Sequence, residues 1–463
     1  MAESASLASA DDRRDARVRH VRLAAYSAWL RRERRLTFPD GEAIRQWSIH
    51  RPVEFWTSVA EYFDLFEVTG LAVPENGNQT VSFPDVRLNY AELATERIDD
   101  SPAIVFLRED GLRETWSWRQ LRTYVSCCRT GLANLGVGVG SRVAGILPNT
   151  LAAVVAFLAT ASLGAIWSVF PPDADESVMC RRIRSLEPTV VLGVDGYVRN
   201  GRLVDMRRRL SAVQRSVGTA TPLVVVPYLD LDPHLEDSLD WGDLMACEEE
   251  LEFAKLPFGH PLWVTHPKDP RLPDEPFVHS HGAIVLEHVK QLALQLDIGW
   301  GTRSLWISKT DSVLWQLLMS GLLVGATIVL YDGSTDYPDS GALWRVADLT
   351  RATYMGVGAS RLQPDRRVAL VPRSLVTLGV LCRPAVACSR GISAERLQKS
   401  LGNRVHIDHL VARSDLSTAV FEPAVAASAE VVVRSGAHPM PLHAVPRSQR
   451  DATPQRASRQ PLS

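Results

Sequence analysis

The chain has 463 residues, of which 46% are hydrophobic and 22% charged, and its 51 Lys and Arg against 53 Asp and Glu leave a net charge of −2. This balance is typical of a folded globular protein of two or three domains, and it excludes disorder of the whole chain. A nearly neutral chain has no general attraction for nucleic acid or for anionic membranes, so neither is expected as a partner.

The N-terminal region is expected to be a polar tail followed by a helix. Within residues 1–35, apolar side chains recur near helical spacing at Val21, Ala24, Ala25, Trp29 and Leu30. No apolar secretory core precedes this helix, and none of the six cysteines forms a C-x-x-C pair. These features predict a cytoplasmic protein with free thiols.

From residue 103 to residue 330, strand-like and helical segments alternate along the chain. The apolar runs 103–107, 142–147 and 189–192 predict strands, and the runs 151–163 and 283–296 predict helices. Such alternation predicts an α/β fold with doubly wound, mostly parallel sheets.

Two long stretches, 143–172 and 312–331, carry no charged residue. Each is long enough to cross a membrane. However, Pro148 interrupts the first stretch, and Gly321 and Gly325 divide the second into a helix-like and a strand-like run. The central strands of a parallel sheet are covered on both faces and give the same apolar signal, so the sequence predicts a buried core here.

The C-terminal region has a different composition. No aromatic residue follows Phe421, and only one acidic residue follows Glu430. Such a segment cannot bury enough apolar surface to offset its ordering entropy, which predicts disorder. Three regions are therefore expected: an N-terminal tail and helical cap over 1–100, an α/β domain over 101–421, and a Pro/Arg/Ser-rich disordered tail over 422–463.

Several blocks of the sequence resemble the adenylate-forming ligases. They are Trp47-Ser48, Phe55-Trp56, and the runs 88–92, 147–173, 195–202 and 320–333. The resemblance implies the large N-terminal domain of such a ligase, with ATP, Mg²⁺ and coenzyme A as its cofactors. It also implies a reaction in which ATP adenylates a small-molecule acyl acid, a short β-keto acid, and coenzyme A then displaces AMP to form the thioester.

The family's phosphate-binding loop should follow the strand-like residues 263–264. Such a loop is rich in Gly, Ser and Thr, because backbone N–H groups must approach the phosphates closely. Here, residues 265–277 contain no glycine and four prolines, and Asp269, Asp274 and Glu275 add negative charge. Lys268 is the candidate nucleotide contact in this segment, but the altered loop is not expected to bind phosphate in the family's manner.

The resemblance implies further site residues in later blocks. Thr310 matches a nucleotide-binding position and Trp315 an acyl-pocket position, although the neighbouring Asp311 and Ser312 depart from the pattern. A plain core tryptophan is the alternative for Trp315. Gly379 matches the first glycine of a turn that shapes the nucleotide site.

Two more pairs complete the candidates. Ser414 matches a phosphate-binding hydroxyl and Asp415 a Mg²⁺-binding carboxylate, for which a surface loop with a solvated Asp is the alternative. Arg199 and Arg202 resemble a basic patch that contacts the phosphate of coenzyme A, and surface arginines without a ligand are the alternative.

The family's ribose-binding aspartate, a following arginine and the catalytic lysine lie farther downstream, the lysine on a small C-terminal domain, and no residue here matches them. Three hypotheses follow. The chain is a truncated and catalytically impaired relative of these ligases, or a working ligase completed by a separate C-terminal domain, or a non-catalytic protein that binds acyl-CoA or a protein partner.

Overall fold

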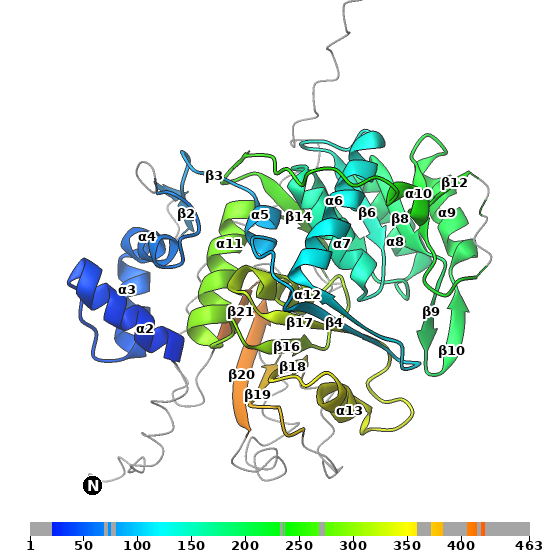
Figure 1. Cartoon of the computed structure of the whole chain (residues 1–463). Helices are drawn as coiled ribbons and strands as arrows, with labels where there is room; N and C mark the ends of the chain where they lie inside the picture. The colour runs from blue at the N-terminus through cyan, green and yellow to red at the C-terminus, as the bar shows by residue number, and fades with distance from the viewer. Residues whose placement is uncertain are drawn as a thin grey trace, which may run out of the picture.

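Two β-sheets packed around a layer of helices form the body of the protein (Figure 1). The structure, a computed structural model, describes residues 21–68, 73–75, 80–231, 235, 237–267, 274–358, 372–382, 405–413 and 418–421. The expected tail 422–463 therefore lies outside the described residues, as do Lys268, Ser414 and Asp415. The three-region division of the chain remains a prediction.

The first sheet has seven strands, which are parallel except for the last pair. In spatial order they are β12 (Ser238–Asp240), β11 (Leu223–Val226), β8 (Val190–Val194), β6 (Arg142–Ile146), β7 (Ile166–Phe170), β14 (Pro261–Thr265) and β15 (Phe277–Ser280). Its main helices are α6 (Trp118–Asn134), α7 (Leu151–Ser162), α8 (Glu176–Leu186) and α9 (Arg207–Val217).

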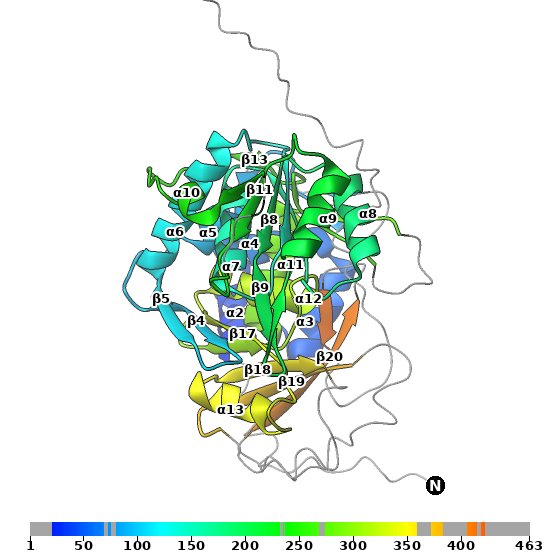
Figure 2. The same cartoon turned by 90° about the vertical axis from the view of Figure 1, so that its right-hand side faces the viewer.

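Helices α7 and α8 cover opposite faces of this sheet (Figure 2). The chain moves one way from β6 to β7 through α7, and it returns past β6 to β8 through α8. Because parallel crossovers are right-handed, the reversal puts the two helices on opposite faces. Ligand sites of open α/β sheets lie beyond the carboxyl ends of the strands near such a reversal.

The second sheet has eight strands and a parallel centre. In spatial order they are β21 (Thr418–Phe421), β20 (His406–Arg413), β19 (Thr377–Cys382), β18 (Tyr354–Gly358), β16 (Arg303–Trp306), β17 (Thr327–Asp332), β4 (Pro102–Arg108) and β5 (Arg113–Ser117). Its helices are α11 (His281–Val289), continued by η2 (Lys290–Gln295), then α12 (Val313–Ser320), continued by η3 (Gly321–Val324), and α13 (Ala342–Leu349).

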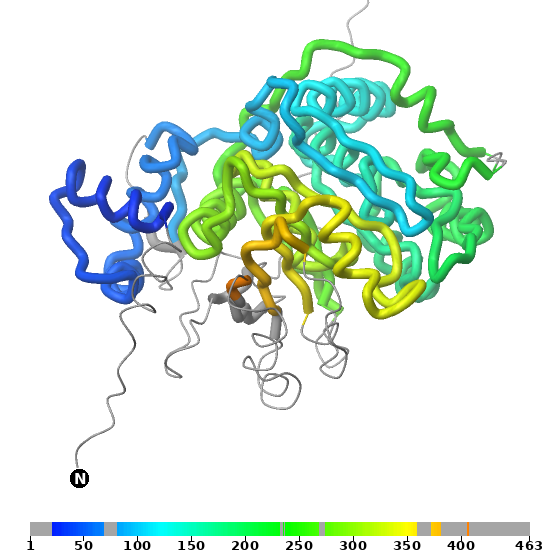
Figure 3. Tube along the Cα trace, turned by 60° about the horizontal axis from the view of Figure 1, so that its bottom comes forward, coloured from blue at the N-terminus to red at the C-terminus, as the bar shows by residue number. Residues whose placement is uncertain are grey.

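The remaining described elements are an N-terminal helical cap over residues 21–62, two short helices and three two-stranded sheets. They are α2 (Val21–Trp29), η1 (Leu30–Arg34), α3 (Gly41–His50), α4 (Pro52–Tyr62), α5 (Tyr90–Ala94), α10 (Trp241–Leu244) and the strand pairs β1–β2 (Val73–Glu75, Thr80–Ser82), β3–β13 (Arg87–Leu88, Leu256–Pro257) and β9–β10 (Gly196–Arg199, Arg202–Asp205). The cap lies beside α11 and η2 (Figure 3). There the buried ion pair Lys290–Glu287, 2.7 Å long, sets its ammonium 5.5 Å from the Trp56 ring centre.

The predicted strands and helices are confirmed, with ends that differ by a few residues. The uncharged stretch 143–172 folds as β6, α7 and β7, and 312–331 folds largely as α12, η3 and β17. No helix among the described residues is long and apolar enough to span a membrane. Both stretches are apolar because they supply the main core, where α7 is buried on nearly every side.

Candidate functional site

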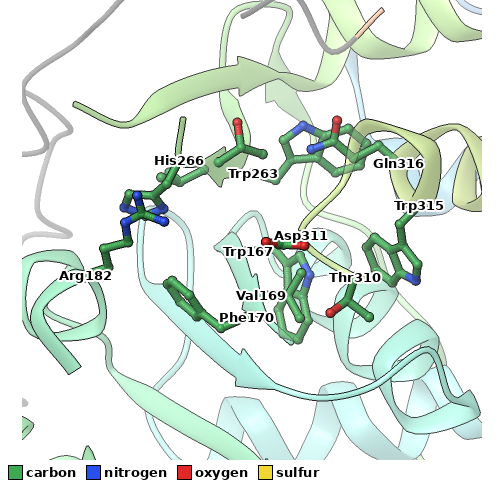
Figure 4. Close-up of a pocket in the computed structure, with 12 residues that line it drawn as sticks. Trp167, Val169, Phe170, Arg182, Trp263, His266, Thr310, Asp311, Trp315 and Gln316 are labelled. Carbon is green, nitrogen blue, oxygen red and sulfur yellow. The ribbon is translucent and has the colours of Figure 1, made fainter. Parts of the chain in front are cut away.

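A narrow cavity lies beyond the carboxyl ends of β7 and β14 (Figure 4). Its volume is about 30 Å³, room for roughly two water molecules. It is lined by Trp167, Val169 and Phe170 from β7, Arg182 from α8, Trp263 to His266 from β14 and the residue that follows it, and Thr310, Asp311, Trp315 and Gln316 from the β16–α12 loop and α12. Both Thr310 and Trp315, which the resemblance implied as site residues, are in this lining.

Three buried indoles set the shape of the cavity. Trp167 and Trp263 are paired across the adjacent strands β7 and β14, and the Phe157 ring of α7 lies between them and Trp315, with ring centres 5.4–6.4 Å apart. Trp167 has room to lie across β6 because residue 145 is glycine, where a Cβ would come within 2.7 Å of the indole. Trp315 is therefore a core residue and a cavity residue at once.

The polar groups of Thr310 and Trp315 are used within the chain. The Thr310 hydroxyl donates to the Leu147 carbonyl oxygen at 2.9 Å, and the Trp315 indole N–H donates to Asn149 Oδ1 at 3.1 Å. Asn149 Nδ2 in turn donates to the carbonyl of Tyr331 at 3.4 Å. The family-like blocks at 147–149, 310–315 and 331 thus contact one another and hold the two sheets together.

Ser312 also has a structural role, although it departs from the family pattern. Its hydroxyl accepts the backbone N–H of Leu314 at 3.1 Å and caps the N-terminus of α12. The cap fixes the start of the helix that carries Trp315 and Gln316 into the cavity wall.

The connection between β14 and β15, where the phosphate loop was expected, is tied at both ends to α8. Arg182 donates from Nη2 to the Pro267 carbonyl at 3.1 Å and to Asp274 Oδ1 at 2.6 Å. Arg181 donates to Asp274 Oδ2 at 2.9 Å. Burial opposes the charged form of Asp274, but the hydrogen bonds from the two arginines outweigh it and lower the pKa of this carboxyl.

His266, beside Arg182 in Figure 4, is neutral at physiological pH. Burial and, to a smaller extent, the positive charge of Arg182 lower its pKa to about 4, although Asp274 acts in the opposite direction. Lys309, which is next to Thr310, is a second cation near the cavity. Its ammonium lies 2.7 Å from the Asp173 carboxylate, so it is paired, as Arg182 is. The charges of Arg182 and Lys309 are thus balanced by carboxylates of the chain itself.

Three polar atoms of the lining have no hydrogen-bond partner within the described part of the chain. They are the indole nitrogens of Trp167 and Trp263 and Oε1 of Gln316. All three side chains are at least nine-tenths buried. Two donors and one acceptor therefore face a small cavity that could hold a polar guest the size of a water molecule.

The other predicted residues that the structure describes, Gly379, Arg199 and Arg202, are not among those that line this cavity. Gly379 is buried inside β19, where it pairs with Gly356 and Asp408, so the turn expected from residue 379 is a strand as far as residue 382. Arg199 and Arg202 face each other across the β9–β10 hairpin. Arg199 donates to the Gly333 carbonyl at 3.4 Å, whereas Arg202 is exposed.

Sequence reasoning missed Trp167, Trp263, Arg182 and His266 as lining residues. No motif marks Arg182, because it is one of several arginines on an amphipathic helix. The position of Trp263 at the end of a strand before the altered loop was the available signal. The charge of Asp274 is visible in the sequence, but its ion pairs with arginines of α8 depend on the tertiary fold.

Comparisons with known proteins identify relatives of this chain. Residues 91–274 match the family of AMP-binding enzymes. The chain is 32% identical to the acetoacetyl-coenzyme A synthetase of Rhizobium meliloti, over 76% of this chain and 55% of the relative, and 30% identical to the acetoacetyl-CoA synthetase of Danio rerio, over 74% and 54%. It therefore spans about half the length of the curated relatives it matches.

A solved structure is similar over more of the chain. The acetoacetyl-CoA synthetase from Streptomyces lividans superimposes with a TM-score of 0.79 at 31% identity, covering 87% of this chain and 64% of that one. The chain is thus a homologue of the acetoacetyl-CoA synthetases and has the α/β fold of the N-terminal domain of the adenylate-forming ligases.

Proposed function

We propose that this chain derives from an acetoacetate–CoA ligase and that its nucleotide site no longer binds MgATP tightly enough for catalysis. The ancestral reaction would convert ATP, acetoacetate and coenzyme A to acetoacetyl-CoA, AMP and pyrophosphate. The homologues support the ligase ancestry. The observation that carries the proposed impairment is the Asp274 carboxylate, which occupies Arg181 and Arg182 beside the cavity.

Charge explains why this arrangement weakens phosphate binding. Triphosphate sites combine backbone N–H donors with cations that are available to the phosphates. Here the connection has four prolines, each without an N–H group, and the neighbouring cations Arg182 and Lys309 are paired with Asp274 and Asp173. Losing two or three charge-assisted hydrogen bonds at roughly 1.5–3 kcal/mol each lowers affinity by several orders of magnitude.

The remaining candidate residues keep the roles implied by the resemblance. Under the proposal, Lys268 and Ser414 are remnants of phosphate contacts and Asp415 of a Mg²⁺ contact. Arg202, exposed on its hairpin, is the candidate for a residual contact with coenzyme A.

The direct test is a ligase assay on the purified chain. Acetoacetate, coenzyme A and MgATP are supplied, and AMP and acetoacetyl-CoA are measured, with a full-length acetoacetyl-CoA synthetase as the positive control. The proposal predicts no AMP above the level without acetoacetate. ATP-dependent formation of acetoacetyl-CoA would contradict it and would favour a working ligase, either alone or with a separately supplied C-terminal domain.

A further inference from the structure

The segment after α10 lies directly along helix α6. At one end, a Cβ on Gly131 of α6 would come within 2.1 Å of the Leu244 carbonyl oxygen, so the two backbones touch there. At the other end, the Ser126 hydroxyl donates to the Glu249 carbonyl. The segment therefore runs antiparallel to the helix between these two contacts.

This path brings two cysteines together. Cys247 lies between Leu244 and Glu249, and Cys127 lies between Ser126 and Gly131. An ion pair between Arg129 and Glu252, 3.4 Å long, holds the same two stretches of chain. The pKa of the Cys127 thiol reflects the same closeness. Burial raises this pKa, and the nearby Glu248 and Cys247 raise it further.

Cys127 and Cys247 are more exposed than Cys128, the other cysteine on this part of α6. Cys247 is exposed and Cys127 half-buried, so neither residue is enclosed in the core. Cys128 is completely buried in the core, and burial raises the pKa of its thiol strongly. Since the thiolate is the reactive form, Cys128 is inert by comparison.

We propose that Cys127 and Cys247 form a reversible disulfide when the chain meets a hydroperoxide. The peroxide oxidises the exposed Cys247 thiol to a sulfenic acid, and water is released when the reagent is hydrogen peroxide. The Cys127 sulfur then attacks the sulfenic sulfur and expels a second water. Overall, two thiols lose two electrons and two protons, and the peroxide is reduced.

The cross-link would enclose β6, β7, β8 and β11 within one covalent loop, because these strands lie between the two cysteines in the sequence. Closing a long loop reduces the entropy of the unfolded chain. Oxidation is therefore expected to raise the midpoint of thermal unfolding, and a dithiol reductant is expected to return it to its original value.

The test is peptide mapping of the full chain after treatment with hydrogen peroxide and blocking of the remaining thiols. Trypsin releases Cys127 in peptide 123–129 and Cys247 in peptide 216–255, since Arg or Lys ends each and none lies inside. The expected product is these two peptides joined, absent after reduction. Because Cys128 is in the first peptide, the Cys128→Ser chain is mapped in parallel and should still give the product.

The matched variants are Cys247→Ser and, as a control, Cys180→Ser on α8. Cys247→Ser should lose both the joined peptide and the rise in unfolding midpoint, while Cys180→Ser should keep both. The proposal is overturned if oxidation joins Cys127 to Cys128, links separate chains through Cys247, or leaves Cys247 as a sulfinic or sulfonic acid without a cross-link.

Discussion

The β6–α7–β7 unit and the β14–β15 hairpin are neighbours in the same sheet, yet they differ in what they retain of the ligase family. In the first, Leu147 and Asn149 make hydrogen bonds to Thr310, Trp315 and Tyr331. In the second, the connection has no glycine, and Asp274 at its end pairs with Arg181 and Arg182.

The difference shows which interactions depend on a ligand. The hydrogen bonds of the β6–α7–β7 unit join one part of the chain to another, so they stabilise the fold whether or not a nucleotide binds. The backbone donors of a phosphate loop contribute mainly when phosphate is present. A chain can therefore keep the first set and lose the second without losing its fold.

The largest expected effect comes from breaking the β6–α7–β7 unit. Phe157→Ala removes a fully buried ring that contacts the three indoles of the cavity, and it should lower the free energy of unfolding by about 3–5 kcal/mol. Chemical denaturation measures this loss. Leu203→Ala is the control, because Leu203 is 66% exposed and should change stability by less than about 0.5 kcal/mol.

Asp332, at the end of β17, should make stability depend on pH. Burial raises its pKa from 3.8 to about 6, although Tyr228, Arg199 and Arg108 favour the charged form. A carboxyl whose pKa is raised on folding binds more protons in the folded state, so it lowers stability as pH rises between these two values. Asp332→Asn should remove this slope and gain on the order of 2 kcal/mol at pH 8. Denaturation is measured for the original chain and the variant at several pH values between 4 and 7. If stability depends on pH in the same way in both, the raised pKa of Asp332 is wrong.

Two tryptophan variants compare an indole N–H that donates a hydrogen bond within the chain with one that has no partner among the described residues. Trp315 donates to Asn149, whereas Trp263 Nε1 has no partner among the described residues, and both side chains are at most 2% exposed. Trp→Phe removes similar volume at each site. Trp315→Phe should therefore be less stable than Trp263→Phe by about 1–2 kcal/mol. Equal unfolding midpoints in urea would refute this difference.

The smallest expected effect concerns the hairpin. Asp274→Asn breaks two partly exposed ion pairs and should change stability by less than about 1 kcal/mol. It also leaves Arg181 and Arg182 without their carboxylate, so the affinity for pyrophosphate in a titration should rise several-fold. Asp100→Asn, which breaks an ion pair of a well-exposed aspartate, is the control and should leave this affinity unchanged.

The strands and helices could be predicted from sequence, because local geometry and burial determine which residue types occupy them. The strand 142–147 and the helix 151–163 correspond to β6 and α7 within a residue. The cavity could be predicted only in part: Thr310 and Trp315 stand in a recognisable block, but Arg182 reaches the site by tertiary packing. Gly379 was expected in a turn, yet the pairing of β19 with both neighbouring strands extends past it.

Thermal unfolding of the purified chain with and without MgATP shows directly whether the nucleotide site still binds. A ligand present at 100 times its Kd adds about 2.7 kcal/mol to the free energy of unfolding, which gives a visible shift of the midpoint. We expect a cooperative transition that does not move at millimolar MgATP. A midpoint that rises with MgATP concentration would show that the nucleotide site still binds, and the proposed impairment would be wrong.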